Sequence, residues 1–116
     1  MDIYHIWCNL KAGVSDLDFA THVRRYLDHL QSQDQLVTYR ITRRKLGLGS
    51  ADLPEFHIQL EFRNLTQLDQ AFATVATRRD PVEAFHHAVN SQVSEVRFAL
   101  YRDFPDPVRH SGEERF

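Results

Sequence analysis

The stretch Glu55-Phe56-His57-Ile58-Gln59-Leu60-Glu61-Phe62-Arg63 alternates strictly between polar and apolar side chains. Its apolar members are Phe56, Ile58, Leu60 and Phe62, and the polar members between them are His57, Gln59 and Glu61. A period of two residues predicts a β-strand that is buried on one face only. We therefore expect this strand to lie at the centre of a small sheet whose apolar face packs on helices.

Three other segments show the same alternation, and they lie at residues 2–10, 36–43 and 93–101. Between the strands, apolar residues follow helical spacing at residues 17–33, 65–76 and 82–90. Good capping residues precede each helical segment: Ser15 or Asp16, then Asn64 or Thr66, then Asp80 with Pro81 at the first helical position. The sequence therefore predicts four strands and three helices.

The order of these elements is β-α-β-β-α-β with the second helix broken, which is typical of a ferredoxin-like α+β fold. We predict a four-stranded antiparallel sheet of strand order 4-1-3-2. Right-handed crossovers place the first and third strands side by side in the middle, where we expect them to run parallel. A single domain is predicted over residues 1–103, followed by an extended tail over residues 104–116, which Phe104 and Phe116 could anchor.

The composition is that of one ordinary globular domain, with 116 residues, 42% of them hydrophobic and 26% charged. The net charge of −2 provides no overall electrostatic attraction to nucleic acid or to an anionic membrane, so neither partner is predicted. The lone cysteine, Cys8, excludes an intrachain disulfide and fits a reducing compartment. Because the N-terminal residues include neither a basic start nor a long apolar run, we predict a cytoplasmic protein.

The polar parity of the four strands gathers the candidate functional residues on one face of the predicted sheet. They are His5, Trp7, Asn9, Thr38, Arg40, Thr42, His57, Gln59, Glu61, Glu95, Arg97 and Tyr101. A single layer of helices covers only the other face, and an exposed central indole would forgo about 1.5–3 kcal/mol of burial. Trp7 therefore favours a second copy of the chain across a two-fold axis. Inside such a dimer, we expect the two arginines to pair with the two glutamates.

Three segments resemble the dimeric α+β barrel superfamily. They are Ile3-Tyr4-His5-Ile6-Trp7, the alternating Glu55-Phe56-His57-Ile58-Gln59-Leu60-Glu61, and Ala84-Phe85-His86-His87-Ala88-Val89-Asn90. The resemblance covers residues 1 to about 102 and implies two ferredoxin-like sheets that close into a barrel, with a pocket beside the polar face. The superfamily includes small monooxygenases, haem-degrading enzymes, isomerases and stress-responsive barrels, and the fold alone does not choose among them.

The histidines on the two central strands are the candidate catalytic residues. His5 and His57 share a parity, so their rings could meet, with Glu61 four residues further along the third strand on the same face. Two imidazoles and a carboxylate could act in acid–base chemistry or bind a divalent metal, while a structural or ligand-contacting role is the simplest interpretation. No tightly spaced motif supports a metal, so none is predicted.

Three further interpretations, namely haem chemistry, RNA binding and phosphate binding, have weaker support in the sequence. Haem-degrading relatives use an asparagine on the first strand and a late helical histidine, for which Asn9 and His86 or His87 could stand, but their third-strand tryptophan is missing here. No cofactor is predicted. The basic cluster of Arg40 and residues 43–45 could suggest RNA binding, yet the third strand lacks the outward aromatic residues that stack bases. The segment of residues 46–54 contains two glycines, but it lacks a P-loop lysine and a third glycine and it joins two strands, which argues against a phosphate loop.

The leading hypothesis is a homodimer that binds a small organic molecule on the polar face. His5 and His57 would contact it, and the predicted binding residues are Trp7, Asn9, Arg40, Glu61, Arg97 and Tyr101, with the arginines holding an anionic group. A second hypothesis is a cofactor-independent monooxygenase or isomerase with His5 or His57 as the base. A third is a structural dimer with a filled interior and no ligand, so the sequence leaves enzymatic activity open.

Overall fold

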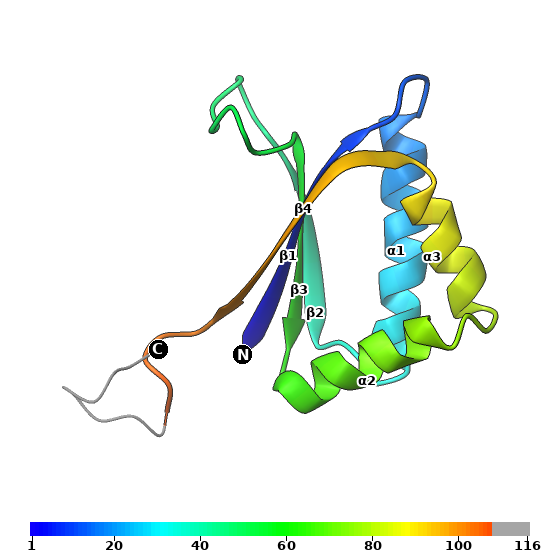
Figure 1. Cartoon of the computed structure of the whole chain (residues 1–116), viewed down its shortest axis with the longest axis vertical. Coiled ribbons are helices and arrows are strands. Elements are labelled where there is room, and N and C mark those ends of the chain that lie inside the picture. Colours follow the sequence, from blue (N-terminus) through cyan, green and yellow to red (C-terminus); the bar gives the residue numbers. More distant parts are fainter. Residues whose placement is uncertain (108–116) are drawn as a thin grey trace.

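The computed structural model describes residues 1–107, which form a four-stranded sheet with three helices on one of its faces (Figure 1). The elements in chain order are β1 (Asp2–Leu10), α1 (Asp16–Ser32), β2 (Thr38–Arg43), β3 (Phe56–Phe62), α2 (Leu65–Ala76), α3 (Val82–Asn90) and β4 (Val93–Arg102). The predicted order of elements, with its broken second helix, is confirmed. Each predicted boundary lies within two residues of the observed one.

The strand order is β2-β3-β1-β4, and every neighbouring pair is antiparallel. The predicted sheet order is therefore confirmed, but the expectation that β1 and β3 run parallel was wrong. Each crossover makes two non-adjacent strands parallel, β1 with β2 and β3 with β4, while the β2–β3 hairpin reverses the chain. The two central strands must consequently oppose one another.

The core lies between the sheet and the helices, and β3 supplies much of it. Its side chains alternate between buried and half-buried, and Phe62 is completely buried, as the sequence pattern predicts. Helix α1 places Phe19 and Leu30 in the same cluster, and Phe19 meets Phe56 edge to face at 5.4 Å. Burying such side chains contributes about 1.5–3 kcal/mol each.

The helix starts explain where the chain turns. The Ser15 hydroxyl accepts a hydrogen bond from the Asp18 N–H at 3.3 Å, and the Asn64 side chain accepts one from the Gln67 N–H at 2.9 Å. These caps satisfy backbone donors that a helix leaves free at its start. Asp80 was predicted to cap the third helix, but the capping residue is Pro81, and it makes no side-chain cap bond.

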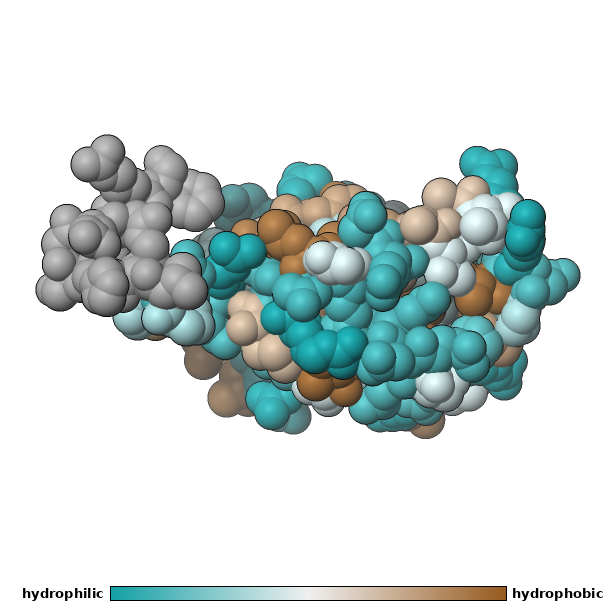
Figure 2. Space-filling model, turned by 90° about the horizontal axis from the view of Figure 1, so that it is seen from below, coloured by the Kyte–Doolittle hydropathy of each residue, from teal (hydrophilic) through white to brown (hydrophobic). Residues whose placement is uncertain are grey.

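The edge strand β4 runs away from the helices in its second half (Figure 1). Phe98 and Leu100 face the helix side of the sheet, as predicted, because they pair with Ile6 and Tyr4. They nevertheless remain 61% and 52% exposed. Seen from the end where α2 lies (Figure 2), the surface is mostly hydrophilic with separate hydrophobic patches.

Past β4, residues 103–107 form neither helix nor strand. Phe104 is 80% exposed and does not anchor the chain, whereas the predicted anchor Phe116 lies outside the described residues. Within residues 1–107, none of the helices combines the length and the apolar character that crossing a membrane requires.

Candidate functional site

The predicted site residues lie in three rows across the polar face of the sheet. One row pairs Thr42, His57, Trp7 and Arg97; the next pairs Arg40, Gln59, His5 and Ala99; the third pairs Thr38, Glu61, Ile3 and Tyr101. Cross-strand partners point to the same side of a sheet. The structure therefore brings the predicted residues to one surface, opposite the helices.

Four aromatic rings form the centre of this surface. The His5 Nδ1 atom lies 2.9 Å from the His57 Nε2 atom, a hydrogen bond between diagonal neighbours on β1 and β3. The Trp7 ring stacks on His57 with their centroids 4.5 Å apart, and Tyr101 meets His5 edge to face at 5.0 Å. The expectation that the two histidines meet is thus consistent with their geometry.

Burial lowers the pKa of His5 below its ordinary value. Burial also lowers the pKa of His57, and the charge of the neighbouring His5 lowers it further. Both rings are therefore neutral at pH 7, so one nitrogen of the pair donates the hydrogen bond and the other accepts it. A neutral imidazole can accept a proton, which is the property that a general base needs.

The charged candidates do not assemble around this pair. Among the described residues, Arg40, Arg97 and Glu61 form no ion pair, so the expected arginine–glutamate pairing does not occur within the single chain. Asn9 instead donates to the Glu95 carboxylate at 2.8 Å and accepts from the Glu55 N–H, which ties three segments together. No group of three potential metal ligands occurs in residues 1–107.

Trp7 is half-buried within its own chain, contrary to the expectation that only a second copy could shield it. The loop between β2 and β3 leans over this face (Figure 1), and beneath it lies a pocket of about 310 Å³. Trp7 and His57 both line this pocket. The stacked His57 ring covers one side of the indole, and the loop approaches it. Trp7 therefore supports a dimer less strongly than its position on the central strand suggested.

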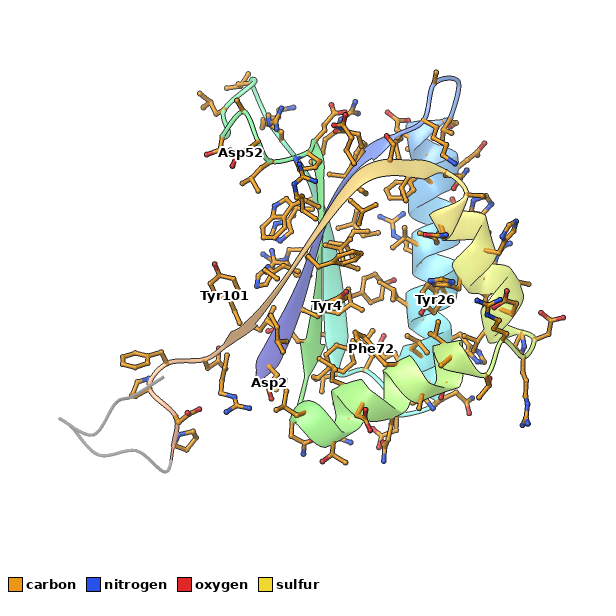
Figure 3. The ribbon with its side chains drawn as sticks, viewed as in Figure 1. Asp2, Tyr4, Tyr26, Asp52, Phe72 and Tyr101 are labelled. Atoms are coloured by element: carbon orange, nitrogen blue, oxygen red, sulfur yellow. The ribbon has the colours of Figure 1, made fainter. Side chains whose placement is uncertain are left out.

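A larger cavity of about 380 Å³ lies on the opposite face, between the sheet and the helices. Side chains of β1, β3, β4 and all three helices line it, and most of them are apolar. Figure 3 shows Tyr4 and Tyr26 pointing toward one another across this space, with Phe72 beside them and Tyr101 on the other side of the sheet. The ligand was predicted to lie on the polar face, whereas the larger of the two cavities lies on the helix side.

Aromatic rings mark the cavity wall near the sheet edge. Tyr4 lies between Phe72, which it meets edge to face at 5.3 Å, and Phe98, on which it stacks at 5.8 Å. Phe72 and Phe98 are 46% and 61% exposed, so this side of the cavity reaches the surface. These rings form an apolar rim through which a small molecule could enter.

Four polar side chains line the cavity: Tyr4, Tyr26, His86 and Asn90. Burial raises the pKa of Tyr4, and burial together with the charge of Tyr4 raises the pKa of Tyr26 to about 12. Both phenols are therefore protonated hydrogen-bond donors at neutral pH. His86 meets the Tyr26 ring edge to face, with their centroids 5.7 Å apart.

These four residues were not predicted as a site, because Tyr4 shares the parity of Ile6 and Cys8 and Tyr26 lies on the apolar stripe of the first helix, where a side chain is expected to pack in the core. A tyrosine on an apolar stripe is the signal that could have found them, since its hydroxyl needs a partner or a cavity. Neither hydroxyl bonds to protein within the described residues. His86 had been considered only as a stand-in for the helical histidine of haem-degrading proteins.

Comparisons place this geometry in context. The structure of At3g17210 from Arabidopsis thaliana is similar, with a TM-score of 0.71, 11% identity, and coverage of 91% of this chain and 98% of that one. SnoaB, a cofactor-independent oxygenase from Streptomyces nogalater, is similar with a TM-score of 0.69, 8% identity, and coverage of 93% and 97%. A dimeric ferredoxin-like protein of unknown function from Jannaschia sp. CCS1 is similar with a TM-score of 0.63 and 11% identity, and the match covers 89% of this chain and 100% of that one.

At such identities these likenesses establish the fold alone, and they confirm the predicted ferredoxin-like architecture. A comparison with curated protein sequences found no match. One family model matches residues 1–116, and it describes a family of unknown function, DUF6614. Because the match spans the whole chain, the protein belongs to the DUF6614 family.

Proposed function

We propose that this protein binds a small, uncharged and largely apolar organic molecule in the cavity between the sheet and the helices. The cavity of about 380 Å³ carries the proposal. Its volume falls within the range of about 300–1,000 Å³ that is usual for ligand pockets, and an apolar lining with a few converging polar groups is the common pattern. Each Å² of apolar ligand surface that these walls remove from water stabilises binding by about 25 cal/mol.

The polar lining supports an uncharged ligand with at least one hydrogen-bond acceptor. No lysine, arginine, aspartate or glutamate lines the cavity, so a charged group would lose its hydration without gaining a partner. Tyr4 and Tyr26 can each donate a hydrogen bond from a protonated hydroxyl. A carbonyl or ether oxygen on a compact ring system would satisfy both the donors and the apolar walls.

Binding to the cavity is testable with N-phenyl-1-naphthylamine, an uncharged dye that fluoresces in apolar sites. We expect saturable binding of about one dye per chain. Replacing Val75, which lines the cavity from α2, with Phe fills part of the volume and should weaken binding by about tenfold, or about 1.4 kcal/mol. The matched control is Leu17→Phe, because Leu17 is 77% exposed on α1. Equal dye affinity in both variants would contradict the site.

Self-association through the polar face is the second part of the proposal. Relatives of the same fold are described as dimeric, and Tyr101 remains 62% exposed on that face. His5 and Tyr101, which meet edge to face on that surface, offer aromatic contact area to a second copy, and a two-fold axis is the commonest way for one surface to meet itself. The mass of the chain is 13.6 kDa, so a dimer of about 27 kDa is readily resolved by sedimentation.

An enzymatic role is the alternative, and the likeness to SnoaB, a cofactor-independent oxygenase, favours it. In the larger cavity the available base is His86, because His5 and His57 lie on the other side of the sheet. If oxygen uptake with activated phenols is observed, His86→Gln should abolish it, and the exposed neighbour His87 supplies the control His87→Gln. Loss of turnover on His57→Gln instead would move the base to the polar face.

A further inference from the structure

The pocket beneath the β2–β3 loop, residues 44–55, differs in character from the cavity among the helices. It measures about 310 Å³ and lies over one end of the polar face, where β1 ends and β3 begins. Trp7 and His57 line it from the sheet, and Arg44 and Lys45 line it from the loop. We propose that this pocket binds a small planar aromatic anion of the benzoate class, stacked on the indole with its carboxylate toward the two cations.

The charge of the pocket is positive once existing ion pairs are accounted for. Arg43 donates to Asp16 at 3.0 Å and to Glu55 at 3.1 Å, so the carboxylate of Glu55 already has a cation. Among the described residues, neither Arg44 nor Lys45 pairs with a carboxylate. Two cations without carboxylate partners beside a concave site favour an anionic ligand.

The loop is held in a shape that keeps the pocket open. The Arg44 guanidinium donates to the Leu53 carbonyl, and the Arg44 N–H bonds to the Glu55 carbonyl at 2.8 Å. A Cβ on Gly49 would lie 2.8 Å from the Arg44 Nε, so the glycine permits the close approach of the loop to this side chain. Arg44 is therefore fixed in place, while the exposed Lys45 can swing toward a ligand.

The sheet side provides the surface for an aromatic ring. Trp7 stacks on His57 at an interplanar angle of 8°, which fixes the indole plane. Burial keeps the pKa of His57 below its ordinary value, so the imidazole adds no charge at pH 7. A planar ligand can extend this stack by offset contact, an arrangement worth about 0.5–1.5 kcal/mol beyond area burial. The pocket thus selects for a ring through Trp7 and for negative charge through the loop.

Trp7 is the only tryptophan of the chain, so its indole N–H gives a single signal in a ¹H–¹⁵N correlation spectrum. We expect sodium benzoate to shift this signal saturably, and benzamide, its uncharged analogue, to bind at least about tenfold more weakly. Raising the salt from 50 to 500 mM should weaken benzoate binding and leave benzamide unchanged. Equal affinity for the two probes, or no shift at all with benzoate, would overturn the proposal.

Two charge-removing variants locate the anion contact. Lys45→Gln should weaken benzoate binding by about threefold or more, since it removes an exposed cation without touching a loop contact. Arg44→Gln should weaken it further, because Arg44 also holds the loop. The control is Arg78→Gln, at the distant turn between α2 and α3, which should leave the affinity unchanged. If Lys45→Gln binds benzoate as tightly as the control, the anion does not lie where we place it.

Discussion

Replacing Tyr101 with Ala tests whether the polar face is the surface of self-association. The ring is 62% exposed in the single chain, and its contact there is the edge-to-face meeting with His5. A large aromatic side chain buries about 150–250 Å² in total, so roughly 90–155 Å² per ring remains for a partner. At about 25 cal/mol per Å², covering that area contributes about 2–4 kcal/mol per protomer.

A two-fold dimer contains this ring twice, but association recovers only part of the area term because ordering and desolvation oppose it. We therefore expect Tyr101→Ala to weaken the dimer by about 2–4 kcal/mol in all, which raises its dissociation constant by roughly thirty- to a thousandfold. Sedimentation velocity over a range of concentrations measures the change. Leu17→Ala is the matched control, since Leu17 is 77% exposed on α1, away from the polar face.

The result that would refute the reasoning is a dissociation constant for Tyr101→Ala equal to that of Leu17→Ala, in a dimer that both variants still form. Such an outcome would move the interface to another surface, and the exposed Phe98 and Leu100 on the opposite face of β4 would become the next candidates. Folding is not expected to confuse the test, because the single ring contact that is lost is worth about 0.5–1.5 kcal/mol.

Three further predictions follow from the same structure. The pKa values of His5 and His57 are lowered in the folded chain, so the unfolded chain binds more protons as the pH falls. The contribution of the pair to stability is therefore present above about pH 6.5 and is lost as the pH falls through the lowered pKa values. His57→Gln should flatten the fall of the urea midpoint between about pH 7 and 5, and an unchanged slope would count against the pair. Burial raises the pKa of the Cys8 thiol to about 11. Native protein should therefore react with iodoacetamide at pH 8 far more slowly than protein unfolded in urea. Equal rates would show that the thiol is accessible in the folded chain. Asn64→Ala removes the side-chain cap of α2 and should lower the free energy of unfolding, measured by urea titration, by about 1 kcal/mol. Asn64→Gly should lower it by only about a few tenths of a kcal/mol. Similar losses for the two variants would point to a role other than capping.

The sequence predicted the fold well because its signals are local and repeat along each element. The alternation of residues 55–63 records directly that β3 has one buried face, and Phe62 and Ile58 are buried as expected. Capping residues such as Ser15 and Asn64 mark helix starts for the same reason, since each acts within three residues. The direction of β1 relative to β3 followed from topology, and the error there was one of reasoning rather than of missing information.

The sequence by itself determined which side chains share a face of the sheet, because strand parity fixes that choice for every residue at once. Tertiary structure alone decided that the larger cavity lies on the helix side and that Trp7 is half-covered by its own chain. The volume between two layers depends on how all the facing side chains pack together, and the fold of the β2–β3 loop depends on contacts such as that of Arg44 with Leu53. No local pattern in the sequence encodes contacts between distant residues, so the two pockets became visible only in the folded chain, although several residues that line one of them had been predicted.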